Sequence, residues 1–446
     1  MISVHPIDSE IFGSAWGRQE LRGLFSDDGL TRSWAEVLAV LAEEEAALGI
    51  IPPGAAAEIA RVMRGEPADL EAVGRGYAAT GHSLLGFIRA QAVRCAGGAG
   101  EWICYGATVQ DVTDTTYARA LLTVAEVAGE DLAALEADLA SLARAHRSTP
   151  MLGRTHGQAG LPITFGYKVA VWVDEIRRHR ARLVELRPRL GVGQLCGGVG
   201  TLSGYGQRGL ELQERVLTRL GLAAPVISWI SARDRFAEFV AWLAFVSATL
   251  DKIGHEVYNL QRSEIAELAE PAGDADVGSI TMPHKRNPER SEQLGTLARL
   301  VRRDADLMIE SLVGDHERDG RSWKVEWAAI PEACVAAGAA LRIARDLVGG
   351  LEVRVETMRR HLDEWHEQLA SESVMLALAQ AIGKQSAHER VHAAAGRARA
   401  SGRSLHDEFR DDPEIAAHVG PDELDRLLAA PTTSLAEALV DRVVGT

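Results

Sequence analysis

The chain has 446 residues and a formal net charge of -15. This length is enough to bury a large core and suggests two or three domains. The acidic balance argues against nucleic acid as the main partner, although it leaves room for a locally positive site that binds an anionic substrate. The four cysteines show no C-x-x-C spacing, which is typical of free thiols in a reducing compartment.

The first ten residues, MISVHPIDSE, carry neither a basic start nor an apolar run, so no signal peptide is predicted. No stretch of membrane-spanning length is without charges. We therefore expect a soluble, cytoplasmic protein with no membrane partner and no nucleic-acid partner.

The composition predicts an all-α fold, because alanine, leucine, glutamate and arginine dominate and period-2 alternation is rare. A first amphipathic helix is predicted over Ser33–Leu48, where Gly49 and two prolines beyond it end the pattern. A second is predicted over Ser83–Ala96. Longer helices follow, and they are expected at about residues 113–146, 162–186, 236–260, 289–312 and 325–347.

Five long helices flanked by smaller helical ends predict an extended helix bundle with two caps. We divide the chain accordingly into an N-terminal helical domain over residues 1–105, a central long-helix bundle over 106–350 and a C-terminal helical domain over 351–446. The amount of apolar helix surface suggests that chains associate. The glycine-rich residues 191–206 lack the spacing of a dinucleotide site, so we interpret them as a flexible loop and expect no cofactor.

Two separated stretches place polar side chains at junctions between loops and helices. In Gly106–Thr115 the hydroxyls and the amide, including Thr108 and Gln110, precede a helix and can bind a carboxylate. In Gly153–Gln158 a polar turn holds His156, and histidine is the residue type best suited to proton transfer at physiological pH. Taken alone, each stretch is also compatible with an ordinary capping cluster or a structural turn.

A third stretch, Gly278–Pro288, is a glycine-opened loop that leads into a helix. Asn287 can cap that helix, and the helix end together with Lys285 and Arg286 forms a site for an anion. The hydroxyl of Ser279 is a poor base unless its oxyanion is stabilised, which an ammonium and backbone donors can do. The alternative is a basic surface loop that only caps the helix. Glycines at 273 and 278 are expected to let the loop close over a substrate.

The sequence of this loop, Gly-Ser-Ile-Thr-Met-Pro-His-Lys-Arg-Asn-Pro, resembles the signature of the fumarase/aspartase superfamily. That superfamily also contains adenylosuccinate lyase, argininosuccinate lyase and 3-carboxy-cis,cis-muconate cycloisomerase. The resemblance runs from about Asp8 to about Arg399. It implies an all-α, three-domain fold with a central long-helix bundle, and a homotetramer in which three subunits build each active site.

The resemblance also implies roles for the residues of the three stretches. Ser279 would be the base that removes the proton β to the leaving group. Lys285 and Asn287 would hold the substrate carboxylate or stabilise the aci-carboxylate intermediate. His156 matches the general acid of adenylosuccinate lyases, and His82 matches a second histidine that orients it or contacts the substrate. Carboxylate oxygens would be bound by Thr108 and Thr155, with further substrate contacts from Gln110, Arg18, Arg233 and Arg318.

The branch of the superfamily stays open at this point. His156 favours cleavage of a C–N bond, because muconate cycloisomerases generally lack a histidine there. In contrast, the segments Leu24–Asp28 and Asp315–Asp319 are more similar to the cycloisomerases. Trp323 and Trp327 stand where adenylosuccinate lyases carry partners for a nucleotide phosphate, which argues against a purine nucleotide.

We therefore expect a carbon–nitrogen lyase that releases fumarate from a small succinyl compound, such as nitrosuccinate or an N-substituted aspartate. Adenylosuccinate lyase proper and the cycloisomerase are the alternatives. A remote one is a zinc hydrolase, since His388-Glu389-Arg390-Val391-His392 fits H-E-x-x-H with only generic third ligands in Glu408 and Glu414. We predict no metal site. A non-catalytic structural protein is the other remote alternative.

Overall fold

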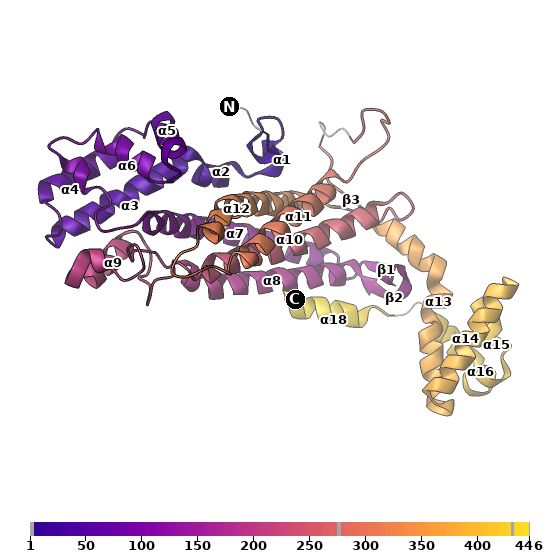
Figure 1. Cartoon of the computed structure of the whole chain (residues 1–446). Helices are drawn as coiled ribbons and strands as arrows, with labels where there is room; N and C mark the ends of the chain where they lie inside the picture. Colours follow the sequence, from indigo (N-terminus) through magenta and orange to yellow (C-terminus); the bar gives the residue numbers. More distant parts are fainter. Residues whose placement is uncertain (1–3, 274–277, 430–431, 446) are drawn as a thin grey trace. The chain divides into compact units, whose positions relative to one another are not determined.

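The computed structural model describes residues 4–273, 278–429 and 432–445 (Figure 1). It is 70% helical with few strands, as the sequence predicts. Two compact units can be separated. Unit 1 comprises residues 1–134, 178–255 and 289–346, and unit 2 comprises residues 135–177, 256–288 and 347–446. The three-domain division expected from the sequence stays a prediction.

Unit 1 begins with short helices that pack around α3, which spans Asp27–Ala47. The Ser26 side chain accepts the N–H of Gly29 and caps α3, so the helix starts six residues before the apolar pattern from which it was predicted. Its inner face is buried against α4 and α9. The short helices here are α1 (Gly13–Trp16), α2 (Gln19–Phe25), α4 (Pro53–Met63), α5 (Leu70–Thr80), α6 (Leu85–Ala92) and α9 (Gly209–Arg219), with 3-10 turns η1 (Pro6–Asp8), η2 (Ala99–Trp102) and η3 (Ser203–Arg208).

All five long helices expected from the sequence are present. They are α7 (Val109–Ala145), α8 (Phe165–Leu190), α10 (Asp234–Gln261), α11 (Glu289–Glu310) and α12 (Gly320–Gly349). In α10 the predicted apolar seam is fully buried, from Phe236 to Leu260. Among the described residues α12 alone is long and apolar enough to cross a membrane, but 72% of its apolar window is buried inside the protein. We interpret it as a core helix.

Unit 2 contains a β-hairpin that the sequence reading did not predict as strands. Strand β1 (Pro150–Thr155) pairs antiparallel with β2 (Gln158–Thr164), and the register shifts between Leu152 and Arg154. The two turn residues, His156 and Gly157, have φ of 54° and 74°. Such a turn needs positive φ at both positions, which explains the glycine. A second short pair joins β3 (Leu268–Ala269) to β4 (Glu352–Val353).

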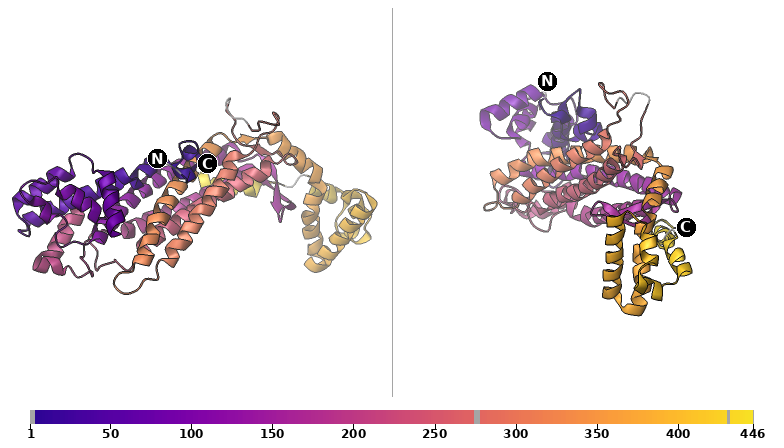
Figure 2. Two further views of the ribbon diagram at one scale, coloured as in Figure 1. Left: turned by 45° about the horizontal axis from the view of Figure 1, so that its top comes forward. Right: turned by 90° about the vertical axis from the view of Figure 1, so that its right-hand side faces the viewer.

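The C-terminal helices of unit 2 form their own core. The second half of α13 (Val355–Ile382) lies beside α14 (Lys384–Ser401), and α15 (Leu405–Arg410), α16 (Pro413–His418) and α17 (Pro421–Leu428) complete the cluster around buried Phe409 (Figure 2). The last helix, α18 (Ser434–Val444), lies beside β2. Arg147 binds Asp441 and Glu437 of α18, while Arg144 and Arg177 donate to carbonyl oxygens near its end.

Candidate functional site

Thr108 lies at the start of α7, and the structure brings it together with a second expected substrate contact. Both terminal nitrogens of Arg318 donate to the Thr108 hydroxyl oxygen, at 3.1 Å each. The Nε of Arg318 has no hydrogen-bond partner among the described residues. A guanidinium beside a hydroxyl at a helix N-terminus forms a positive, donor-rich surface that suits a carboxylate.

Asp111 fixes the loop before α7, and sequence reasoning did not single it out. Its buried carboxylate accepts the backbone N–H groups of Thr108, Cys196 and Gly197 at 2.9, 2.8 and 3.0 Å. Burial raises the pKa of Asp111, and the three N–H donors oppose that shift. The glycine-rich loop is therefore tied to the candidate carboxylate site.

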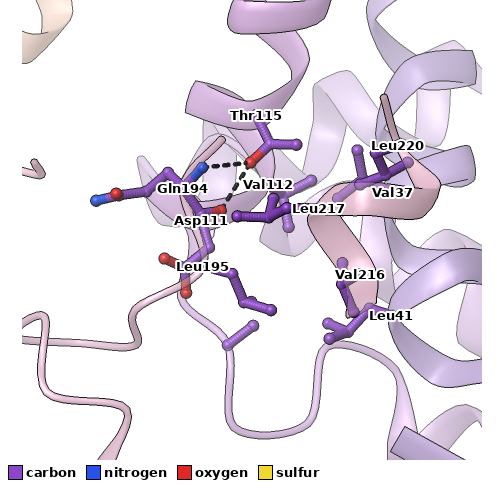
Figure 3. A pocket seen from close by; sticks show the side chains of 11 residues that line it. Val37, Leu41, Asp111, Val112, Thr115, Gln194, Leu195, Val216, Leu217 and Leu220 are labelled. Carbon is purple, nitrogen blue, oxygen red and sulfur yellow. Dashed lines mark hydrogen bonds between the residues drawn. The ribbon is translucent and has the colours of Figure 1, made fainter. Parts of the chain in front are cut away.

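Figure 3 shows Asp111 at a small cavity, next to the hydrogen bonds that join Thr115 to the backbone of Gln194. The cavity measures about 10 Å³, which is room for about one water molecule. Its remaining walls are apolar, so it cannot hold a substrate. Gln110 is also buried, and its amide nitrogen donates to the Ile230 carbonyl oxygen at 3.1 Å.

Arg233 lies in the core of unit 1. Its guanidinium donates to Asp114 at 2.7 and 3.0 Å and to Glu326 at 2.7 and 2.5 Å. It also stacks on Trp229 with 5.0 Å between guanidinium carbon and ring centroid. Burial raises the pKa of both carboxyl groups, and the arginine opposes it. The guanidinium already donates hydrogen bonds to two carboxylates. Its expected contact with a substrate stays a prediction.

Two further expected residues have partners within unit 1. His82 follows α5, and its Nδ1 accepts the N–H of Leu85 at 3.2 Å, which places the histidine at the start of α6. Arg18 forms ion pairs with Glu20 and with the buried Asp131 of α7. Their expected roles toward the substrate stay predictions.

In unit 2 the hairpin turn presents Thr155 and His156 to solvent. His156 adopts a left-handed conformation that is uncommon for a residue other than glycine. The base of the turn is held by Arg154, which donates to buried Glu267 at 2.6 and 2.9 Å. His361 of α13 lies 2.6 Å from the same carboxylate. Arg154 and His361 lie 113 and 94 positions from Glu267 in the sequence, so no local pattern could predict the cluster.

The signature loop begins at Gly278, and residues 270–277 separate it from the end of β3 at Ala269. The hydroxyl oxygen of Ser279 accepts the N–H groups of Thr281 and Met282 at 3.3 and 3.0 Å. A Cβ on Gly278 would lie 2.2 Å from the carbonyl oxygen of Lys285, so only glycine fits where the loop folds back on itself. The loop thereby brings the Ser279 and Lys285 backbones into one turn. Its base is anchored by Arg286, which donates to the Glu270 carbonyl oxygen at 2.9 Å.

Comparisons with known proteins bear on this arrangement. The family described as lyase matches residues 16–302, and the family described as adenylosuccinate lyase C-terminus matches residues 367–443. N-acetyl-S-(2-succino)cysteine lyase of Dickeya dadantii is 39% identical over 99% of this chain and 97% of its own. The chain belongs to the fumarase/aspartase superfamily. The predicted membership of a lyase superfamily of enzymes is confirmed, whereas the relative from Dickeya dadantii is named for a sulfur-linked substrate and does not support the predicted carbon–nitrogen specificity.

Other members of the superfamily are nearly as similar. Adenylosuccinate lyase of Pyrococcus abyssi is 35% identical over 99% of this chain and 98% of its own, and 3-carboxy-cis,cis-muconate cycloisomerase of Pseudomonas aeruginosa is 36% identical over 98% and 96%. The crystal structure of a fumarate lyase from Mesorhizobium sp. superposes with a TM-score of 0.88 at 35% identity, covering 96% of this chain and 98% of that one. The fumarase/aspartase-like fold is therefore confirmed.

The H-E-x-x-H residues lie on α14, where the rings of His388 and His392 stack with centroids 6.1 Å apart. Glu408, a candidate third ligand, is paired with Arg397 and Arg403. Within residues 4–273, 278–429 and 432–445, no group of three or more His, Cys, Asp and Glu side chains is placed to hold a metal ion. Nothing in this cluster supports the hydrolase alternative.

Proposed function

We propose that the protein is a lyase that releases fumarate from a 2-substituted succinate by β-elimination. Ser279 removes a proton from the carbon beside one carboxylate, and the electron pair forms the new C=C bond as the bond to the substituent breaks. His156 supplies a proton to the departing heteroatom. The products are fumarate and the protonated substituent, so atoms and electrons balance.

The observation that carries this proposal is the turn in which Gly278 packs against the Lys285 backbone, because it brings the backbones of the serine and the lysine into one short loop. Ionising a serine needs nearby donors and a positive charge. The Ser279 oxygen already accepts two backbone N–H groups. Proton removal next to a carboxylate also concentrates negative charge on the substrate, which Lys285 and Asn287 are suited to stabilise.

The substituent can leave through nitrogen or through sulfur. The sequence favours nitrogen because of His156, whereas the relative from Dickeya dadantii is named for an S-succinyl cysteine. We favour sulfur for the preferred substrate, with nitrogen, including nitrosuccinate and N-substituted aspartates, as the second candidate. A thiol has a pKa near 8.5, so a thiolate leaves with little help from an acid, while a departing amine requires protonation.

A panel of candidate substrates tests this function. The purified enzyme is incubated separately with N-acetyl-S-(2-succino)cysteine, adenylosuccinate, argininosuccinate, aspartate, nitrosuccinate and 3-carboxymuconate, and fumarate is followed by ultraviolet absorbance. Free thiol is measured in parallel. We expect fumarate from at least one succinyl compound, with the highest kcat/KM for the thioether. Turnover of 3-carboxymuconate alone, without fumarate, would identify a cycloisomerase instead.

We further propose that the enzyme works as a cytoplasmic homotetramer with shared active sites. Large apolar side chains are exposed on the long helices of unit 1, including Val184 of α8, Phe245 of α10 and Ile309 of α11, at 74, 60 and 53% of full exposure. Exposed apolar side chains of this size on bundle helices support burial against other copies of the chain.

A further inference from the structure

A large polar cavity in unit 1 is lined by four arginines. It measures about 730 Å³, within the range of small-molecule pockets. Its walls come from residues 9–22, from the middle of α7 and from the end of α12. The arginines are Arg18, Arg22, Arg342 and Arg345, and the acidic side chains facing the same space are Glu10, Glu20 and Asp131.

Two of the arginines are neutralised by carboxylates. Asp131 is buried and binds both Arg18 and, at 3.0 Å, Arg345. Arg18 also binds Glu20, whose side chain is 68% exposed. These pairs make one wall of the cavity rigid and nearly neutral. The Nε of Arg345 is buried and has no hydrogen-bond partner among the described residues, so one donor of this wall is unused.

The other two arginines keep their charge. Arg342 donates to the carbonyl oxygen of Ser14, which is a neutral acceptor. The guanidinium of Arg22 lies close to Gly13. A Cβ atom on that glycine would be only 3.0 Å from the Arg22 Nη1. Neither arginine forms an ion pair within the described part of the chain. Two guanidinium groups without a carboxylate partner therefore lie beside the same short helix, α1.

We propose that this cavity binds a small, multiply charged oxyanion, either a phosphate or a polycarboxylate, through Arg22 and Arg342. Guanidinium groups bind both kinds of anion through paired N–H donors. The unused Nε of Arg345 provides a further donor. Neither Ser279 nor His156 takes part in this binding, although Arg18, which the resemblance places among the substrate contacts, lines the same cavity.

Calorimetric titration of the full-length protein at low ionic strength tests the site, with inorganic phosphate, citrate and acetate as probes. We expect phosphate or citrate to bind and acetate to bind far more weakly, and the better of the first two identifies the class. Arg22→Ala and Arg342→Ala should each weaken binding about tenfold or more, because each removes a charge-assisted hydrogen bond. Arg302→Ala, which removes a half-exposed arginine of α11, should leave the affinity unchanged.

Glu20→Gln gives a result of opposite sign. It removes a negative charge from the cavity wall and frees Arg18, so binding should tighten severalfold. A purely structural role for the arginines does not predict tighter binding. Thermal unfolding of each variant checks that the fold is retained. The proposal is overturned if no probe binds at millimolar concentration, if the two arginine variants bind like the Arg302 variant, or if binding is lost on replacing Lys285 of the signature loop.

Discussion

Ser279 illustrates how a weak base gains its reactivity from its surroundings. Its oxygen accepts two backbone N–H groups, and hydrogen bonds to the ionised form lower the pKa of an acid. We predict that Ser279→Ala lowers kcat by about two to four orders of magnitude, a range typical of lost general-base catalysis, while secondary structure and thermal unfolding stay unchanged. Fumarate release and circular dichroism provide the two measurements. Full activity in the folded variant would remove the base from the mechanism.

His156 should matter in proportion to the basicity of the leaving group. We predict that His156→Ala impairs elimination of an amine most, and elimination of a thiol or nitrite less, because the last two leave readily without a proton. The measurement is the ratio of kcat/KM between variant and wild type for each substrate. Each substrate serves as a control for the others, and an equal loss on all of them would contradict a role as general acid.

Glu45 is a buried carboxyl group whose two oxygens have no hydrogen-bond partner among the described residues. Burial raises its pKa to about 9 from an ordinary value of 4.5. Between these two values the folded protein binds one proton more than the unfolded protein, so the stability supplied by this group is complete below pH 4.5 and is lost as the pH rises toward 9. Glu45→Gln should therefore stabilise the protein by about 3 kcal/mol at pH 7, and by more at pH 8.

Denaturant unfolding at pH 5, 7 and 8 measures this effect. Glu43→Gln on the same helix is the matched control, because the hydrogen bond from Arg64 lowers the pKa of Glu43. Its carboxylate stabilises the folded state above pH 4.5 and loses that contribution as the pH falls, so this variant should be the less stable one at pH 7. A pH-independent gain for Glu45→Gln would show that its proton is not the cause.

At the scale of elements, the helices were readable from the sequence because apolar residues recur every three or four positions and glycine or proline marks their ends. Their starts were readable only in part: α11 begins at Glu289 as predicted, whereas other helices begin elsewhere. The first turns of α7 and α12 are polar, so the helices begin at Val109 and Gly320, earlier than the pattern. The hairpin escaped prediction because β1 and β2 carry glycine and proline and a register shift, which erase the alternation of a strand.

The candidate site, too, could be predicted from the sequence only in part. The signature loop and the hairpin turn could be predicted, since they are contiguous in sequence. Asp111 and Glu267 could not, because most of their partners are 85 to 113 positions away in the sequence and only the fold brings them near. Long-range ion pairs leave no local pattern.

Glu267 joins the hairpin to the strand that precedes the signature loop, so we predict that Glu267→Gln lowers kcat about tenfold with little change in KM. The amide keeps the shape but loses the charge that fixes Arg154, and a looser turn displaces His156 from its reacting position. Steady-state kinetics separate the two constants. Glu264→Gln, at an exposed position three residues earlier, is the control, and equal kinetics for both variants would exclude this role.

At the scale of the whole molecule, the shared-site tetramer makes a prediction that a self-contained protomer does not. With an amine-releasing substrate, chains carrying Ser279→Ala and chains carrying His156→Ala should each be nearly inactive, yet their mixture should regain activity. If different chains supply the two residues, random mixing in equal amounts leaves about a quarter of the sites with both groups intact. The measurement is fumarate release after co-refolding, with light scattering for the mass. No recovery in a mixed tetramer would mean that one chain supplies both groups.

The contacts of α18 have a practical consequence for anyone who shortens or extends this protein. That helix is held in place by hydrogen bonds from three arginines, Arg144, Arg147 and Arg177. A premature stop before residue 434 would remove the acceptors that α18 provides for these three arginines, of which Arg177 would keep its ion pair with Glu136. It would also expose the side of β2 that α18 covers. A purification tag added after residue 446 would instead follow α18, which these arginines already hold in place.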